Sequence, residues 1–267
     1  MKKRLSVIVI SWNEIDTLCK CLSTLVPTID FEKDEIILVD NGSKDNTVEK
    51  VKKLYPKINV IGLKKNIGVV PARNVGIKNA TGTYIMTLDN DTRVLSTKII
   101  GEVVEKIFKS TPNLGLLGFR LLNPDGTIQS STRRYPNILQ PFAARIPFLL
   151  KFKIFKHIQS NHLMEDVDSE DKNELTIVDY VLGANQIYRR KDADRLGGYD
   201  ENIFYGPEDC DFCLRIKDLG LNTALCSEVK IEHDYNRRTQ KFSMITIKHI
   251  MGFYYLFLKR RELWYLQ

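Results

Sequence analysis

Strand-like and helix-like patterns alternate between residues 5 and 89, and this alternation limits the possible folds more than any other feature of the chain. Runs of β-branched and other apolar residues predict strands at 5–11, 34–43, 58–63 and 83–89. Helical spacing and capping residues predict helices between them, at 14–26, 43–55 and 68–82. Because such an alternation forms a sheet covered on both faces, the sequence predicts an α/β fold with a mostly parallel central sheet.

Three of the predicted strands end in polar clusters. The clusters are Trp12-Asn13-Glu14, Asp40-Asn41-Gly42-Ser43 and Asp89-Asn90-Asp91. In open α/β sheets a ligand binds beyond the carboxyl ends of the strands. We therefore expect the three clusters to line one crevice.

Asp89 and Asp91 allow two interpretations. Alternate side chains of an extended segment share a face, which places the two carboxylates about 7 Å apart along the chain. Mg²⁺ and Mn²⁺ prefer oxygen ligands and are commonly held by one or two carboxylates. Taken alone, the segment is more typical of a turn, since Asp and Asn favour turns through local hydrogen bonds. Both interpretations stay open at this point.

A second acidic group, Glu208, Asp209 and Asp211, occupies the first turn of a predicted helix. The helix N-terminus alone explains these charges, because it favours acidic side chains. It does not explain the glycine- and aromatic-rich approach at 197–207, which is typical of a flexible loop that closes over a substrate. His233 ends a later strand-like run, where a single histidine is usually structural.

Positive charge is concentrated in two segments of a chain with 40 basic and 33 acidic residues and a net charge of +7. Acidic residues are absent from 126–164 and from 235–261. The insert near 134–160 interleaves cations with aromatic residues, including Phe142, and is too short to span a bilayer. It favours an anionic membrane surface, and we expect no nucleic-acid partner. Two alternatives remain, namely helices packed on the catalytic domain and a subunit interface, and the oligomeric state stays unknown.

The five cysteines are odd in number, and the N-terminal apolar run is too short for a membrane span and lacks a cleavage site. We therefore expect a reducing, cytoplasmic compartment. Four cysteines form two close pairs that could be zinc ligands, but no knuckle glycines flank them. Buried free thiols are the favoured interpretation.

Taken together, the motifs resemble family two glycosyltransferases with the GT-A fold. The resemblance rests on "SVIVISWNE", "IILVDNGSKDNT", "NIGVVPARNVGI", "LDNDT", "GGYDENIFYGPEDCDFCLR" and "IEHDYNRRT", in this order, and covers about residues 4–239. The stretch 178–201 is similar to rhamnosyltransferase-like enzymes of bacterial surface polysaccharide synthesis. The implied fold is a GT-A (Rossmann-like) sheet with helices on both faces and a C-terminal helical tail.

The resemblance implies a donor site for a nucleoside diphosphate sugar, either dTDP-rhamnose or a UDP-sugar. Asp40 would bind the pyrimidine base, Asp89 the ribose, and Asp91 a divalent Mn²⁺ or Mg²⁺ ion. His233 would complete the metal site or touch the leaving phosphate. The other implied nucleotide-side residues are Ser11, Trp12, Asn13, Asn66, Gly68, Arg73 and Asn90. For Arg73 a structural ion pair is an equal alternative.

For the acceptor side, the resemblance implies Asp209 as the catalytic base and Glu208 beside it. A single base acting opposite the leaving group leads to inversion at the anomeric carbon. The implied acceptor is a hydroxyl of a lipid-linked saccharide, which would place the enzyme peripherally on the inner face of the cell membrane. The rival is a non-catalytic GT-A-like scaffold of a membrane polysaccharide complex, against which the intact Asp91, Asp209 and His233 argue.

The chain is predicted to divide into three parts. Residues 1–95 form the nucleotide-sugar-binding half of a single GT-A domain. Residues 96–235 form the acceptor-binding and catalytic half, and 236–267 form a C-terminal amphipathic helical segment. The glycine-rich turn of nicotinamide dehydrogenases does not follow the first strand, which argues against that class, and the absence of a P-loop motif excludes P-loop enzymes.

Overall fold

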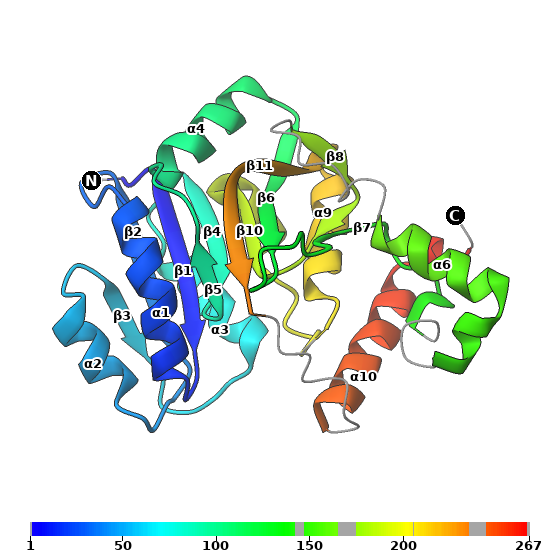
Figure 1. The fold of residues 1–267 in the computed structure, drawn as a ribbon, viewed down its shortest axis with the longest axis horizontal. Coiled ribbons are helices and arrows are strands. Elements are labelled where there is room, and N and C mark those ends of the chain that lie inside the picture. Colours follow the sequence, from blue (N-terminus) through cyan, green and yellow to red (C-terminus); the bar gives the residue numbers. More distant parts are fainter. Residues whose placement is uncertain (1, 142–146, 165–174, 205, 235–243, 266–267) are drawn as a thin grey trace.

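The first half of the protein is a parallel sheet with helices between its strands. The computed structural model describes all residues except 1, 142–146, 165–174, 205, 235–243 and 266–267 (Figure 1). The strands pair in parallel in the order β3-β2-β1-β4. They are β1 (Leu5–Ser11), β2 (Asp34–Asp40), β3 (Asn59–Gly62) and β4 (Tyr84–Asp89). The intervening helices are α1 (Ile15–Leu25), η1 (Val26–Thr28), α2 (Thr47–Leu54) and α3 (Val69–Asn79).

The second half continues the same sheet with mixed pairing. β10 lies antiparallel between β4 and β6, β11 runs parallel to β6, and β5 and β8 pair antiparallel with β11. The strands are β5 (Thr92–Val94), β6 (Leu114–Leu122), β8 (Thr176–Val178), β10 (Asn185–Arg189) and β11 (Asn222–His233), with β7 (Thr132–Arg133) and β9 (Tyr180–Val181) in a separate pair. The helices are α4 (Ile100–Ser110), η2 (Pro147–Lys151), α6 (Lys153–Leu163), α8 (Arg190–Leu196), α9 (Glu208–Asp218), α10 (Met244–Lys259) and η3 (Arg261–Trp264).

Helices cover both faces of this sheet, as predicted. In β1, Val7 and Val9 face one apolar core with α1 and α4, while Ile8 faces a second core with α3, α9 and α10. This alternation is the period of two that a strand imposes on its side chains. Each fully buried side chain of this kind stabilises the fold by roughly 1.5–3 kcal/mol. The α/β prediction is therefore confirmed, with parallel pairing throughout the first four strands.

Some predicted boundaries differ from the structure. The helix expected at 43–55 begins at Thr47, because Asp45 accepts hydrogen bonds from Thr47 Oγ1 (2.5 Å) and the Ile15 amide (3.1 Å) and so stabilises a turn. The helix expected to end at Gly82 ends at Asn79. The predicted division at residue 95 stays a prediction, and the sheet continues across it.

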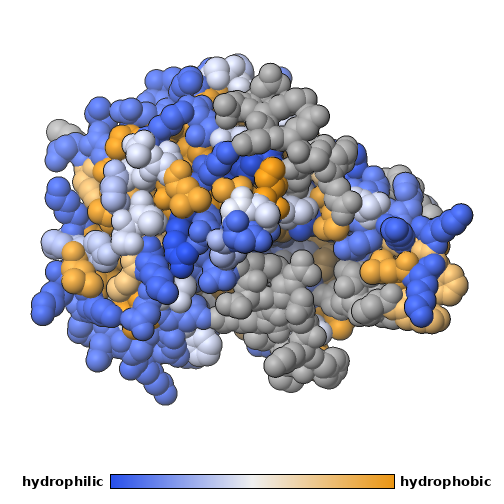
Figure 2. Space-filling view, in the orientation of Figure 1, coloured by the Kyte–Doolittle hydropathy of each residue, from blue (hydrophilic) through white to orange (hydrophobic). Residues whose placement is uncertain are grey.

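Three of the exposed apolar residues, Phe148, Phe152 and Ile154, lie in or between η2 and α6. Figure 1 shows α6 at the end opposite α2, with α10 next to the body of the protein. Figure 2 shows apolar and hydrophilic surface side by side over the α6 end. None of the helices within the described ranges combines the length and apolarity needed to cross a membrane. Phe142 and the acidic stretch at 165–174 lie outside the described residues.

Candidate active site

The carboxyl ends of β1 and β2 form a polar notch. Ser11 and Asp40 are register partners, and both are buried. Asp40 Oδ2 accepts a hydrogen bond from the Ser43 amide (3.1 Å). Asp40 Oδ1 and Ser11 Oγ are buried without a hydrogen-bond partner among the described residues. Because buried polar atoms are nearly always satisfied, this pair of atoms fits the polar edge of a bound ligand.

Asn41, which the sequence placed in a strand-end cluster without a role of its own, holds the loop before α3 against this notch. Its Oδ1 accepts a hydrogen bond from the Ile67 amide (2.9 Å), and its Nδ2 donates to Asn66 Oδ1 (3.2 Å) and Gly68 O (3.1 Å). Gly68 has a φ of +96°, and a Cβ there would lie 3.2 Å from the Phe204 ring. The position therefore requires glycine. In the sequence, the signal for a role of Asn41 was its position directly after Asp40 in "VDNGS".

The loop after β1 is tied to the loop after β2. Asn13 Oδ1 accepts a hydrogen bond from the Lys44 amide (2.7 Å), and the Asn13 amide donates to Ser43 Oγ (2.9 Å). Asn13 adopts a left-handed φ of 54°, a conformation that asparagine tolerates better than most residues. The side chain of Trp12 beside it is 45% exposed. This leaves an indole at the rim of the notch.

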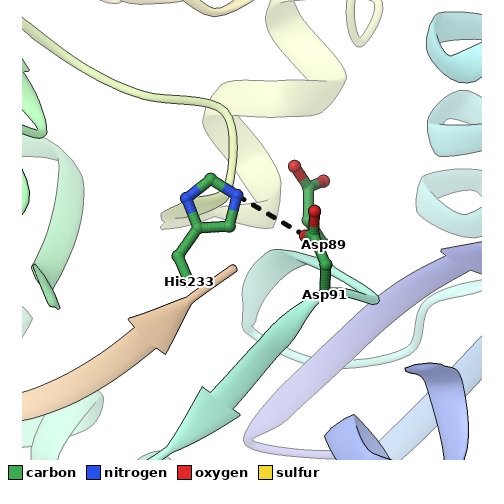
Figure 3. A group of neighbouring side chains, drawn as sticks. All are labelled: Asp89, Asp91 and His233. Atoms are coloured by element: carbon green, nitrogen blue, oxygen red, sulfur yellow. Dashed lines mark ion pairs between the residues drawn. The ribbon is translucent and has the colours of Figure 1, made fainter. Parts of the chain in front are cut away.

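Asp89, Asp91 and His233 converge at the next strand ends (Figure 3). One ligand atom from each lies within 4.8 Å of the others. His233 comes from the end of β11 and meets this place because it pairs in register with Thr92 of β5. Asp91 Oδ1 lies 3.5 Å from His233 Nε2, and that oxygen is buried without a hydrogen-bond partner in the described structure. Two carboxylates and an imidazole suit Mn²⁺ or Mg²⁺, and the unsatisfied Oδ1 fits such an ion.

Gln129 orients the imidazole of His233. Its Nε2 donates to Asn123 Oδ1 (3.0 Å) and His233 O (3.2 Å), so its Oε1 accepts from His233 Nδ1 (2.7 Å). This fixes the tautomer and turns Nε2 toward Asp91, as an outer-shell partner does for a metal ligand. Burial opposes the charged imidazole, but the neighbouring Asp91 carboxylate raises the pKa of His233 above its ordinary value. No sequence signal identified Gln129, because only the fold brings it to His233.

Arg73 links the cation site to the second acidic group. Its buried guanidinium donates from Nη2 to Asp89 Oδ1 (2.8 Å) and Gly183 O (3.2 Å), and from Nη1 to Glu208 Oε1 (3.1 Å). Burial disfavours the charge of Arg73, but the two carboxylates raise its pKa above the ordinary value. Of the two alternatives for Arg73, the structure contains the ion pairs. Any contact of Arg73 with a nucleotide stays a prediction.

Asp209 and Glu208 begin α9 close to Gly183. Asp209 Oδ2 accepts a hydrogen bond from the Gly183 amide (3.0 Å), and Oδ1 accepts from the Cys210 amide (2.7 Å). A Cβ at Gly183 would lie 3.2 Å from Arg73 and 3.5 Å from Asp209, so the site leaves little room for a larger residue. Burial raises the pKa of Asp209, and it raises the pKa of Glu208 to about 7 even though Arg73 opposes the shift.

The remaining predicted residues divide between these groups. Asn66 and Gly68 belong to the loop held by Asn41, whereas Asn90 Nδ2 donates to Glu14 Oε2 (3.1 Å) at the start of α1. The notch at the ends of β1 and β2 lies beside Asp89, because Ile10, which precedes Ser11, pairs in register with Asp89. The structure therefore brings the predicted residues to one edge of the sheet.

The cysteines do not form a metal site. All five are free, and within the described ranges the group of Asp89, Asp91 and His233 is the one that could hold an ion. Burial raises the pKa of Cys21 to about 12, so its thiol stays protonated. The interpretation of the cysteines as free thiols is confirmed.

A mixed sheet with polar side chains gathered beyond its carboxyl ends is the arrangement of a GT-A-type α/β protein, and solved structures share this fold. One is the crystal structure of GalNAc-T7 with UDP, GalNAc and Mn²⁺, with a TM-score of 0.63, 17% identity, and coverage of 88% of this chain and 44% of that one. S. aureus TarS 1-349 has a TM-score of 0.57 and 18% identity, with 86% and 60% covered. The chain thus spans less than two thirds of either structure.

The profile of Glycosyl transferase family 2 matches residues 6–196, and the chain belongs to this family. It is 28% identical over 238 residues to the uncharacterized glycosyltransferase YwdF of Bacillus subtilis (strain 168), covering 85% of this chain and 73% of that protein. It is 38% identical over 106 residues to the poly-beta-1,6-N-acetyl-D-glucosamine synthase of Staphylococcus aureus (strain MSSA476), covering 39% and 25%. The protein is therefore a glycosyltransferase.

Proposed function

We propose that the protein transfers a sugar from a pyrimidine nucleoside diphosphate to a hydroxyl of a saccharide acceptor, with inversion and with Mn²⁺ or Mg²⁺. The observation that carries this proposal is the meeting of Asp89, Asp91 and His233 beside the Arg73–Glu208 pair. The guanidinium of Arg73 thus contacts both Asp89, from the candidate cation site, and the buried Glu208. Such an arrangement suits a reaction that separates a diphosphate from a sugar.

The donor nucleoside would occupy the notch at the ends of β1 and β2. Asp40 Oδ1 and Ser11 Oγ would satisfy the polar edge of the base, and Trp12 and Asn13 would pack around it. Asn66, Gly68 and Asn90 complete this side in our proposal. UDP and dTDP present nearly the same base edge to a carboxylate. A UDP-sugar and dTDP-rhamnose are therefore both proposed donors.

The diphosphate would lie beside Asp91 and His233, with the ribose near Asp89. A divalent ion bound there would stabilise the negative charge that develops on the departing diphosphate. The protein would hold that ion through Asp91 and His233, and Gln129 would keep the imidazole in its ligand orientation. Arg73 adds a buried positive charge to the same region.

Asp209 is the proposed base. It would accept the proton of the acceptor hydroxyl as that oxygen bonds to the anomeric carbon, while the bond from that carbon to the diphosphate breaks. General base catalysis of this kind contributes on the order of a hundredfold or more. Glu208, fixed by Arg73 and by the Gly206 amide (2.9 Å), would shape the acceptor side. A single displacement inverts the anomeric centre and requires no protein nucleophile.

We further propose a lipid-linked saccharide acceptor in cell-surface polysaccharide synthesis, at the inner face of the cell membrane. The similarity to a polysaccharide synthase supports the polysaccharide product, and the rhamnosyltransferase-like stretch at 178–201 favours dTDP-rhamnose. Exposed Phe148, Phe152 and Ile154 stand among lysines of η2 and α6, as a face that meets an anionic membrane would.

The test is the release of nucleoside diphosphate from a panel of UDP- and dTDP-sugars in the presence of Mn²⁺. We expect slow cleavage of at least one of these donors, loss of cleavage with EDTA, and recovery with added Mn²⁺. Asp91→Asn should lower turnover about a hundredfold or more. Asp16→Asn removes an exposed carboxylate from α1 and should retain turnover. Cleavage that survives metal removal, or an active Asp91→Asn protein, contradicts the proposal.

A further inference from the structure

Lys259, the last residue of α10, joins two carboxylates near the proposed base. Its Nζ lies 2.7 Å from Asp200 Oδ2 and 2.8 Å from Asp211 Oδ1. Asp200 belongs to the loop between α8 and α9, and Asp211 belongs to α9 itself. The side chain of Asp211 is completely buried. One ammonium group therefore connects the C-terminal helix to both the loop and the helix that carries Asp209.

Arg215 adds contacts that attach the α8–α9 loop to α9. Arg215 of α9 donates from Nε to Asp211 Oδ2 (2.7 Å) and from Nη1 to Leu196 O (3.0 Å) and Gly198 O (2.8 Å). The start of the loop is thus fixed to α9 by Arg215, and Asp200 is fixed to α10 by Lys259. Without Lys259, Asp200 would lose its cation and Asp211 would keep only Arg215.

α10 also covers the end of the loop. Lys248 Nζ lies 3.5 Å from the centre of the Phe204 ring. Gly206 has a φ of +128°, and a Cβ there would lie 2.6 Å from the His249 ring, so α10 leaves no space for a side chain. The Gly206 amide in turn donates to Glu208 Oε2 (2.9 Å). The position of α10 is therefore transmitted through the loop to the first turn of α9.

The ion pairs of Lys259 are built into partly buried surroundings. Burial opposes its charge, but hydrogen bonds and charge from Asp200 and Asp211 raise its pKa above the ordinary value. Tyr255, one turn earlier on α10, donates from its hydroxyl to Asp200 Oδ2 (3.2 Å). Because charged groups with defined partners orient one another more firmly than apolar contacts do, Lys259 can set the register of the three segments.

The geometry points to Lys259 as a positioning residue for sugar transfer, which holds the α8–α9 loop and α9 so that Glu208 and Asp209 face the acceptor. The inference rests on the proposed function, in which Asp209 is the base. It assigns to the C-terminal helix a part in catalysis, although Lys259 touches neither substrate nor reacting atoms. Displacements of about 1 Å at a reacting group can lower a rate by up to about a hundredfold.

Lys259→Met tests this inference, with Arg260→Met as the matched control. Arg260 pairs with Asp218 at the opposite end of α9, so its loss removes an ion pair between the same two segments away from Asp209. We expect Lys259→Met to lower kcat for the best nucleotide sugar of the panel about tenfold or more. The Kd for UDP with Mn²⁺ should stay within about twofold, because the donor notch is formed by β1 and β2. Arg260→Met should keep both values.

Two further measurements separate positioning from general stability. Lys259→Arg should recover most of kcat, since a guanidinium can reach both carboxylates, and amide hydrogen exchange at 198–204 should accelerate in Lys259→Met but not in Arg260→Met. If Lys259→Met does not fold, Asp200→Asn should give the same fall in kcat and the same faster exchange. The inference is wrong if kcat in these variants equals that of Arg260→Met, or if nucleotide affinity falls as much as kcat. An inactive wild-type protein would instead refute the proposed function.

Discussion

Arg73 is the residue on which the two sides of the site depend. Its guanidinium is shared by Asp89 from β4 and Glu208 from α9. Arg73 and Glu208 are buried, whereas the Asp89 side chain is 37% exposed. Removing one member of a buried ion pair leaves the others without compensation, which costs about 3–5 kcal/mol in proteins. Arg73 therefore keeps the carboxylates of Asp89 and Glu208 together, which belong to the donor and acceptor sides in our proposal.

The pH dependence of turnover should report the paired acids at the start of α9. Burial raises the pKa of Asp209 and raises that of Glu208 to about 7, and a base works only when ionised. Activity should therefore increase with pH along an acid limb that lies above the ordinary carboxyl range of about 4. Because the two groups titrate together, Glu208→Gln should move this limb to lower pH.

Steady-state kinetics between about pH 4 and pH 9 measure this limb. Asp209→Asn is the accompanying variant and should abolish transfer while it still binds UDP. An acid limb at the position of an ordinary carboxyl, or one that Glu208→Gln leaves in place, contradicts the assignment of these roles.

For single residues, the sequence predicted candidate site residues where a polar residue type falls at the end of a predicted strand. Asp40, Asp89 and Asp91 could be selected because polar residues rarely follow a buried strand without a reason. Asn41 belonged to a strand-end cluster, but its contacts with the loop 66–68 could not be predicted, and Gln129 could not be selected, because only the tertiary structure brings these partners near. Hydrogen bonds between distant residues leave no periodic pattern in a sequence.

Among the elements, α10 depends on charge for its attachment to the loop before α9. Burial alone would raise the pKa of Asp200, but hydrogen bonds from Lys259 and Asn202 lower it to about 2. A carboxyl with a lowered folded-state pKa stabilises the native state above its unfolded pKa, near 4. That stabilisation is lost as the pH falls from about 4 toward about 2.

Chemical denaturation of the wild-type protein and of Asp200→Asn checks this attachment. The difference in their free energies of unfolding should be full at about pH 7 and about pH 5, and smaller at about pH 3. Asp194→Asn, on the exposed side of α8, is the control and should differ little from wild type at each pH. A difference for Asp200→Asn that is constant down to about pH 3 would contradict the ion pair.

The elements themselves were largely readable from the sequence, whereas their pairing in the second half was not. Alternating apolar runs identified the first four strands, and adjacent βα units fix their parallel order. β10 is only five residues long, and it lies between β4 and β6 although neither precedes it directly in the chain. Short strands that pair with distant partners depend on tertiary packing. Local strand propensity therefore does not predict their pairing.

For the whole molecule, the proposed membrane surface makes a measurable prediction. Phe148, Phe152 and Ile154, in and between η2 and α6, are more than half exposed, and Lys151 Nζ lies 5.3 Å from the centre of the Phe148 ring. The protein should cosediment with phosphatidylglycerol vesicles but not with phosphatidylcholine vesicles. Binding should weaken as NaCl rises from about 0.05 M to about 0.5 M, because salt screens the attraction of the lysines.

Replacing these three residues with serine should lower vesicle binding about tenfold or more, since each loses buried apolar area in the bilayer interface. The matched control replaces Leu54, Leu95 and Ile177, which are also exposed but lie elsewhere, and should bind as the wild type does. If the first triple variant binds vesicles normally, and the wild-type protein dimerises in sedimentation experiments, the surface is a subunit interface instead.

The strand order also determines when the ion-binding residues can meet during synthesis. His233 lies at the end of β11 and reaches Asp91 through the pairing of β11 with β5, in which His233 lies opposite Thr92. A nascent chain that has emerged as far as α8 holds both aspartates but not the histidine. An ion bound by all three residues would therefore require β11 to be synthesised and paired with β5, so a chain that ends at α8 would offer the two carboxylates alone.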